Sequence, residues 1–279
     1  MWLIDNSFIG NWETLDATSR IRVVSAIDAG LGVRLCWETI REALNVGPRQ
    51  ELLLGRARLL HAASVQAPFR DAWEILFSEL RGSPDPSWSS ADHLRFREGM
   101  AGLARGGAPG RSVTEIPSEI RAEKEKSLKG YKELKAKFSK PSLQKPWDSK
   151  VSFDEFVGTW WKAHADTITK FYRDRDPSIR FGVRDVLADP NSFPFAWAWP
   201  MAEPALMYRH AAQRRKVHEG DYFDTLRLVY LAGVDGLVTD DKGLTELVLL
   251  VWGDRKTVIN TPEFVRKAGV QTLPEEPAQ

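Results

Sequence analysis

The first part of the chain alternates short apolar runs with amphipathic segments. Residues 1–4 ("MWLI") form an apolar run that ends at "DNS", and residues 12–29 carry apolar side chains near helical spacing. Residues 33–37 ("VRLCW") predict a second short strand, and residues 38–47 ("ETIREALNVG") predict a helix that Gly47 closes. The order strand, helix, strand, helix is typical of a parallel α/β sheet.

The same alternation returns near the end of the chain. Residues 221–233 predict a helix with Asp221 as its N-cap, because a side-chain oxygen there satisfies free N–H groups. We therefore expect an α/β core built from residues 1–46 and 217–270, followed by a disordered tail at 271–279. After the helix at 221–233, the sequence predicts a strand at 235–239, a helix at 242–253, a strand at 256–261 and a short helix at 262–269.

The middle of the chain, residues 47–216, loses this alternation and predicts a large, mainly helical insertion. Within it, residues 121–150 hold ten Lys or Arg and four acidic residues, a local balance of +6. This segment is either a solvated helix face and linker or a basic arm for phosphate groups. The aromatic runs "WW" (160–161) and "FAWAW" (195–199) are expected in the core, with base stacking as the alternative.

Composition narrows the class of protein. The 279 residues are 43% hydrophobic and 28% charged with a formal net charge of +1, as in ordinary soluble globular proteins. The single cysteine, Cys36, excludes an internal disulfide and a cysteine-rich zinc site. The N-terminus lacks the features of a signal peptide, and no apolar run reaches the roughly 20 residues of a membrane span. We therefore expect a cytoplasmic protein without a membrane partner.

Acidic residues recur where predicted strands end and helices begin. Asp5 ends the first apolar run, Asp240 and Asp241 end a late one, and Glu42 and Asp224 lie on neighbouring helices. Ligands gather where the carboxyl ends of parallel strands meet. Clustered carboxylates repel one another, and a divalent cation such as Mg²⁺ or Mn²⁺ is the usual way to hold them ionised together. Each acid also has a simpler interpretation as a helix cap, a turn or a solvated helix residue.

Other catalytic signatures are missing from the sequence. The five histidines show no metal-ligand spacing, and "DNS" lacks the second aspartate of a phosphatase loop. The sequence also contains no glycine-rich phosphate-binding loop of the Walker or dinucleotide type. The acids therefore remain the best candidates for chemistry.

Four segments resemble the PIN domain, the metal-dependent nuclease fold of bacterial toxins and RNA-processing enzymes. They are "LIDNSF", "CWETIREAL", "DTLRLVYLAGVDGLVTDDKGLTEL" and "KTVINTPEFV", and the resemblance covers about residues 1–46 and 217–268. It departs from compact members of the family in the long insertion between the second and third acids. The matching residues are Asp5, Glu42, Asp224 and Asp241 as metal-binding and catalytic acids, Asp240 as a substitute for Asp241, and Ser7 and Thr239 as supports.

The resemblance implies a three-layer α/β fold with a central parallel sheet and a Mg²⁺- or Mn²⁺-dependent endoribonuclease. In such an enzyme the metal activates a water that hydrolyses RNA, and cleavage of structured DNA is a close variant. The alternative is a catalytically inactive PIN-like module whose helical insertion binds RNA or a protein partner. An antitoxin partner and a homo-oligomer stay open. The candidate nucleic-acid contacts are Lys124, Lys126, Lys129, Lys132, Arg214, Arg215 and Lys216.

The adjacent aspartates Asp240 and Asp241 are expected to have different roles. Successive residues that leave an extended strand point to opposite sides, so only one of the two faces a shared site easily. In the PIN domain the fourth acid follows a threonine in the pattern T-x-D, which Thr239 and Asp241 match, so the resemblance selects Asp241 for that site. It leaves Asp240 to cap the helix that follows.

Overall fold

The chain folds around a small parallel sheet. The computed structural model describes residues 1–46, 51–107, 151–211 and 220–271, together with Arg49, His218 and single positions between 122 and 132. In this part of the chain the strands β1 (Trp2–Ile4), β2 (Val33–Arg34), β3 (Gly236–Val238) and β4 (Thr257–Ile259) lie in the order β2-β1-β3-β4, and every pairing is parallel. The α/β class and the parallel sheet predicted from the sequence are therefore confirmed.

The central strands β1 and β3 come from opposite ends of the chain and approach closely. Trp2 stands opposite Gly236 in their register. A Cβ atom at Gly236 would lie 2.5 Å from the carbonyl oxygen of Thr257 and 2.6 Å from the Trp2 ring. Only glycine fits at this point, which fixes the register of the strand that carries "LVTDD" to the site.

Side chains alternate across the sheet and serve two hydrophobic cores. Leu3 and Leu237 belong to one core, whereas Ile4, Val238 and Ile259 belong to the other. This is the period of two expected for strands that are buried on both faces. Strands of two or three residues are thus enough to join the two cores.

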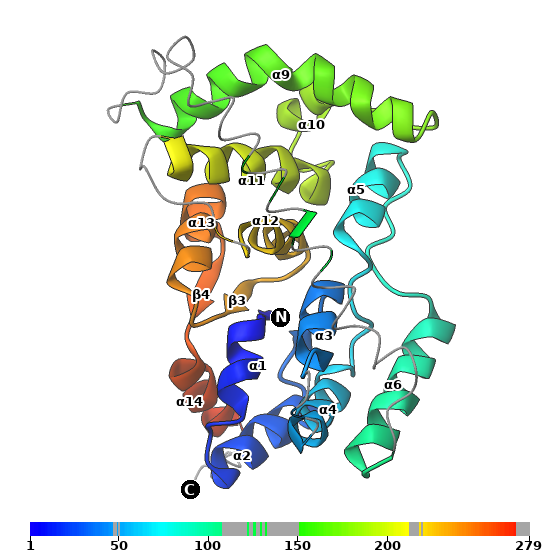
Figure 1. The fold of residues 1–279 in the computed structure, drawn as a ribbon, viewed down its shortest axis with the longest axis vertical. Coiled ribbons are helices and arrows are strands. Elements are labelled where there is room, and N and C mark those ends of the chain that lie inside the picture. Colours follow the sequence, from blue (N-terminus) through cyan, green and yellow to red (C-terminus); the bar gives the residue numbers. More distant parts are fainter. Residues whose placement is uncertain are drawn as a thin grey trace, which may run out of the picture.

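Helices cover both faces of the sheet (Figure 1). The first core contains side chains from α5 (Ala72–Leu80), α9 (Phe153–Arg175), α10 (Val183–Ala188), α11 (Pro194–Ala211), α12 (Asp221–Tyr230) and α13 (Lys242–Trp252). The second contains side chains from α1 (Asn6–Trp12), α2 (Ala17–Asp28), α3 (Trp37–Leu44), α4 (Glu51–Ala63), α6 (Ser90–Ala104) and α14 (Thr261–Gln271). Among the described helices, none combines the length and the apolar character that crossing a membrane requires.

The aromatic runs of the middle segment pack into the first core. Trp160, Trp161, Trp197 and Trp199 are all buried, so the expectation of core packing is confirmed over base stacking. α11 contains prolines at 200 and 204. Because Pro204 has no N–H to donate to the carbonyl of Pro200, that carbonyl lacks its helical partner. The indole N–H of Trp161 donates to it instead, at 2.6 Å.

Two predicted elements differ from the structure. The helix expected over residues 12–29 begins later, as α2 at Ala17, because the Asp16 side chain accepts from the Ser19 N–H at 2.9 Å and caps it. A separate helix, α1, precedes it and was not predicted. The strand expected over 33–37 ends at Arg34, since Trp37 already begins α3 with Cys36 as its N-cap. The apolar run continues through both elements and therefore hides the boundary.

The later elements agree in order, with smaller differences at their ends. The helix expected over 221–233 is α12 followed by the 3-10 turn Leu231–Gly233. Its N-cap is Gly220, so the prediction of Asp221 as the cap is wrong. The Asp221 side chain instead accepts from the N–H of His218 at 2.6 Å.

Candidate functional site

A pocket of about 390 Å³ lies at the carboxyl ends of the two central strands. Its walls include the four acids that the PIN resemblance assigns to the metal, and each comes from a different element: the N-caps of α1 and α13, the helix α3 and the first turn of α12. Parallel strands that end at one edge explain how distant parts of the chain meet here. The lining residues are Asp5, Asn6, Ser7, Glu42, His218, Gly220, Asp221, Asp224, Arg227 and Asp241.

Asp5 is held rigidly at the floor of this pocket. It is the N-cap of α1, and its Oδ2 accepts from the Ser7 N–H at 3.1 Å, the Ser7 hydroxyl at 2.8 Å and the Thr239 hydroxyl at 2.9 Å. Burial alone would raise the pKa of Asp5, but Arg227 and the hydrogen bonds from Ser7 outweigh it and hold that pKa below its usual range. Asp5 is therefore a carboxylate whose orientation is fixed.

Ser7 and Thr239 join the two loops that carry the acids. Their hydroxyl oxygens lie 3.0 Å apart. The Ser7 hydroxyl accepts from the N–H of Asp240 at 2.9 Å, and the Thr239 hydroxyl accepts from the N–H of Asp241 at 3.1 Å. Both residues thus orient Asp5 and the end of β3, a contact that fits the supporting role predicted for them.

Arg227 lies among the acids, and the sequence prediction missed it. Its side chain is 5% exposed and pairs with Asp5 through Nε at 2.7 Å, with Asp224 through Nη1 at 3.1 Å, and with Glu42 through Nη2. Burial opposes its charge, but the neighbouring carboxylates outweigh this effect and raise the pKa of Arg227 well above its usual value. A charged residue inside the apolar run "LRLVY" is the signal that could have found it.

Asp224 is largely buried beside other carboxylates. Burial raises the pKa of Asp224 to about 7, Arg227 opposes this increase, and the nearby charges of Asp5, Asp241 and Asp221 add to it. Burial is thus the main reason that Asp224 binds its proton more tightly than usual, and the neighbouring carboxylates add to this effect. Of the two carboxylate oxygens of Asp224, Oδ1 accepts a hydrogen bond from Arg227, and no donor among the described residues reaches Oδ2.

Asp240 and Asp241 do point to different sides, but the assignment of the helix cap is reversed. Asp241 caps α13, because its Oδ1 accepts from the N–H groups of Gly243 at 2.6 Å and Leu244 at 3.0 Å. The prediction that Asp240 caps this helix is therefore wrong. Asp241 also lines the pocket, and in the described part of the chain no donor reaches its Oδ2.

Asp240 is directed away from the pocket and ties other elements together. Its carboxylate accepts from the N–H of Thr261 at 3.1 Å, from the Thr261 hydroxyl, and from the Asn11 side chain at 2.8 Å. The structure thus brings Asp241 together with the other acids and leaves Asp240 outside. Asp240 thereby connects the end of β3 to the start of α14 and to the end of α1.

Glu38 and Glu42 lie one turn apart on α3, yet only Glu42 lines the pocket. Glu38 is 2% exposed, and burial raises its pKa to about 7. Asp221, which the sequence prediction treated only as a cap, also lines the pocket, and His210 Nε2 lies 3.2 Å from its Oδ2. The structure therefore places Glu42, the residue that the resemblance matched, in the pocket, and leaves the nearby Glu38 out of it. The pairing of Asp221 with His210 had no local sequence signal.

The predicted nucleic-acid contacts are only partly described. Lys126, Lys129 and Lys132 are helical and exposed. Lys124, Arg214, Arg215 and Lys216 lie outside the described residues. Their contact with a phosphate backbone stays a prediction.

Carboxylate oxygens at this pocket are the donors that Mg²⁺ and Mn²⁺ prefer. In the described part of the chain, however, no group of three or more histidine, cysteine or acidic side chains is arranged to hold a metal, and Arg227 pairs with three of the four acids. Comparison with known proteins adds no assignment, since no family model, curated protein or solved structure matches this chain.

Proposed function

We propose that this protein is a PIN-like nuclease that hydrolyses phosphodiester bonds of RNA with the help of Mg²⁺ or Mn²⁺. One observation carries the proposal: Asp5, Glu42, Asp224 and Asp241, from four elements at both ends of the chain, line a single pocket at the carboxyl edge of a parallel sheet. Repulsion between four carboxylates that line one pocket destabilises the fold. A purely structural role gives no reason to place them together.

The residues of the pocket fit a divalent cation by charge and by donor type. Arg227 offsets one of the four carboxylates, so the pocket keeps a net negative charge when all four acids are ionised. Asp224 and Asp241 are the most accessible of the acids, and each keeps one oxygen without a donor among the described residues. Asp5, Glu42, Asp224 and Asp241 would hold the metal. A second cation there is the simplest way to keep them all ionised.

When bound, the metal would supply an activated water and stabilise charge on the phosphoryl oxygens. The chain's own residues would set the geometry. Ser7 and Thr239 fix the orientation of Asp5, and the N-terminus of α13 fixes Asp241. Arg227 would add a positive charge near a bound phosphate and would offset part of the repulsion between the acids and the substrate.

A catalytically inactive PIN-like module is the second candidate, and Arg227 favours it. A guanidinium that pairs with three of the acids can serve as a permanent replacement for the metal. The pocket would then be a structural ion-pair network, and the helical insertion would carry the binding function. The two candidates differ in whether the chain takes up a divalent cation at all.

A cleavage assay with a binding control separates the two candidates. Purified chain is incubated with a mixture of structured and single-stranded RNA in Mn²⁺, and calorimetry measures Mn²⁺ uptake. We expect Asp224→Asn to abolish both cleavage and uptake, with Asp254→Asn, an exposed change outside the pocket, as the matched control. Uptake of Mn²⁺ without RNA cleavage would indicate that the substrate is DNA or another phosphodiester. Absence of Mn²⁺ uptake would favour the inactive module.

A further inference from the structure

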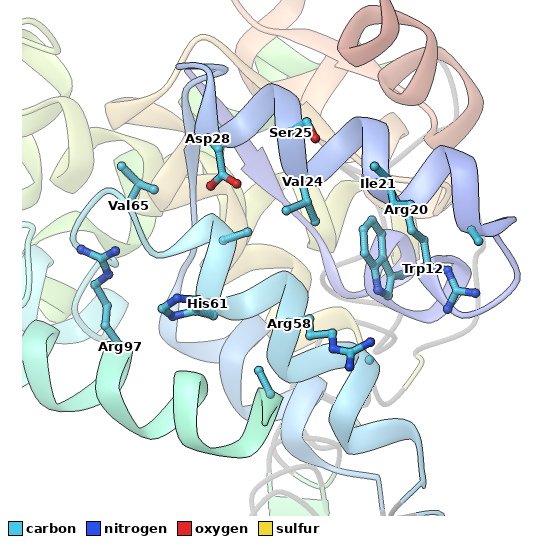
Figure 2. Close-up of a pocket in the computed structure, with 14 residues that line it drawn as sticks. Trp12, Arg20, Ile21, Val24, Ser25, Asp28, Arg58, His61, Val65 and Arg97 are labelled. Carbon is cyan, nitrogen blue, oxygen red and sulfur yellow. The ribbon is translucent and has the colours of Figure 1, made fainter. Parts of the chain in front are cut away.

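A second cavity lies among helices of the other core, apart from the candidate site. It has a volume of about 620 Å³ and is lined by residues of α2, α4 and α6, with Trp12 at the end of α1 (Figure 2). It shares no described lining residue with the acidic pocket. Its volume is within the range of about 300–1,000 Å³ that small-molecule sites occupy. We call it the α2–α4 groove.

The groove has an apolar surface that the fold leaves uncovered. Ile21 and Val24 project into it from one face of α2, and Ala62 lines it from α4. Ile21 is 65% exposed and Val65, at the rim, is 48% exposed. Large apolar side chains gathered at a concave surface are a feature of binding sites rather than of ordinary protein surface.

A glycine keeps the groove open. Gly55 lies inside α4, where glycine destabilises a helix by about 1 kcal/mol relative to alanine. A Cβ atom at this position would meet no atom within 4 Å, so packing does not demand the glycine. The space above Gly55 is the groove itself, and a larger side chain there would fill it.

Basic groups surround the apolar surface and lack partners. Arg20, Arg58 and Arg97 line the groove, and in the described part of the chain none of them makes an ion pair. Arg97 Nε and His61 Nδ1 are buried atoms with no hydrogen-bond partner among the described residues. Asp28 is the acidic residue of the lining. Three arginines and one aspartate give the lining a net positive charge, which favours an anionic ligand.

Figure 2 shows how the two kinds of surface combine. His61 and Arg97 lie toward one side of the groove, Arg20 and Arg58 lie toward the other with Trp12, and Val24 lies between them. A ligand that satisfies this surface needs an apolar body and an acidic group. An arginine pairs strongly with a carboxylate, sulfonate or phosphate oxygen, and more so beside an apolar wall that excludes water.

We propose that the α2–α4 groove binds a small amphipathic anion, with an acyl chain or fused aromatic rings over Ile21 and Val24 and its acidic group held by the surrounding arginines. The volume, the open space above Gly55 and the excess of arginine over aspartate in the lining all fit a molecule of this kind. The proposal does not depend on the chemistry of the acidic pocket.

Fluorescence titration with anilinonaphthalene sulfonate, an amphipathic anion, tests the proposal on the full chain. We expect saturable binding of one dye per chain, with dodecanoate as a competitor. Dodecanol has the same apolar chain without the charge, and it should need a concentration about tenfold higher to displace the dye.

Variants locate the binding. Gly55→Leu should abolish it while the melting temperature stays equal or rises, because leucine favours the helix and its side chain fills open space. Gly99→Leu is the matched control, since Gly99 is an exposed glycine of α6 with open space above it and does not line the groove. Arg58→Gln and Arg97→Gln should each weaken binding about tenfold. Arg22→Gln, an exposed change on α2 outside the groove, should leave it unaltered.

The outcomes are decisive in either direction. Loss of binding in Gly55→Leu, together with full binding in Gly99→Leu, supports the proposal. Unaltered dye binding in Gly55→Leu overturns it, because the dye then binds elsewhere. Equal competition by dodecanol and dodecanoate also overturns it, because the groove would then be an apolar face that another protein covers rather than an anion site.

Discussion

At the scale of single residues, Arg227 dominates the candidate site. It is buried on α12 and pairs with Asp5, Glu42 and Asp224, so it decides how much negative charge the pocket presents to a ligand. A buried ion pair gains little over apolar packing, but removal of one partner leaves an unpaired buried charge. The stability of the pocket and its response to a cation are therefore linked through this side chain.

Replacement of Arg227 by methionine tests that link. Without metal, we expect the variant to lose roughly 3–5 kcal/mol of unfolding free energy, because the acids lose their internal counter-ion. Mn²⁺ should raise the melting temperature of the variant by more than that of the unaltered chain, since the added cation takes over the lost charge. Thermal and urea unfolding with and without Mn²⁺ measure both effects, with Arg22→Met as control. Equal stabilisation of the two proteins by Mn²⁺ would contradict the account.

The adjacent aspartates should separate stability from chemistry. Asp240→Ala removes the acceptor for Thr261 and Asn11, and we expect a loss of about 2 kcal/mol of unfolding free energy with cleavage retained. Asp241→Asn should keep the melting temperature nearly unchanged, because asparagine also caps a helix, and should abolish cleavage. Thermal unfolding and the RNA assay check both. Loss of cleavage in Asp240→Ala, at a temperature where the variant is fully folded, would show that the catalytic role was wrongly assigned to Asp241 instead of Asp240.

At the scale of elements, the sequence predicted what depends on local periodicity. The parallel strands and the helices that follow them can be predicted from short apolar runs and their spacing, whereas Glu42 was singled out only by the resemblance to the PIN domain. The end of β2 was misplaced because Cys36 and Trp37 continue the apolar run into α3. Arg227 was missed for a different reason: whether a charged residue is buried depends on partners that are distant in sequence.

The helix α11 shows how such distant partners stabilise an irregular element. Trp161 on α9 donates to the carbonyl of Pro200, which receives no helical hydrogen bond because Pro204 has no N–H to donate. Trp161→Phe should therefore destabilise the chain by about 1–3 kcal/mol through a buried, unpaired carbonyl. In a Pro204→Ala background the new N–H can bond to that carbonyl, and the same substitution should cost less. A double-mutant cycle by urea unfolding measures the coupling. Additive effects of the two changes would contradict this account of the helix.

At the scale of the whole molecule, both ends of the chain build the sheet and bring two largely buried acids, Glu38 and Asp224, close to Arg227. Burial raises the pKa of Glu38 and of Asp224 to about 7. Each group therefore binds its proton more tightly in the folded chain than in the unfolded one. This contribution to stability is complete below the unfolded pKa and is lost as pH rises through the folded pKa.

The metal-free chain should therefore become less stable as pH rises from about 4 to about 7 through these two groups. Glu38→Gln should flatten that part of the pH dependence, because glutamine has no proton to lose. Urea unfolding at a series of pH values gives the slope, and Glu98→Gln, an exposed change on α6, is the control. An identical slope in Glu38→Gln and the unaltered chain would show that the carboxyl of Glu38 does not carry the effect.

The central claim is that four acids from the two ends of the chain form one site for a divalent cation. Anomalous diffraction from a crystal soaked in Mn²⁺ tests it most directly. We predict a single Mn²⁺ peak in the acidic pocket, in contact with Asp224 and Asp241, that disappears in crystals of Asp224→Asn. An empty pocket at saturating Mn²⁺, with Arg227 still paired to Asp5, Glu42 and Asp224, would contradict the claim and identify the arginine as the permanent cation of the site.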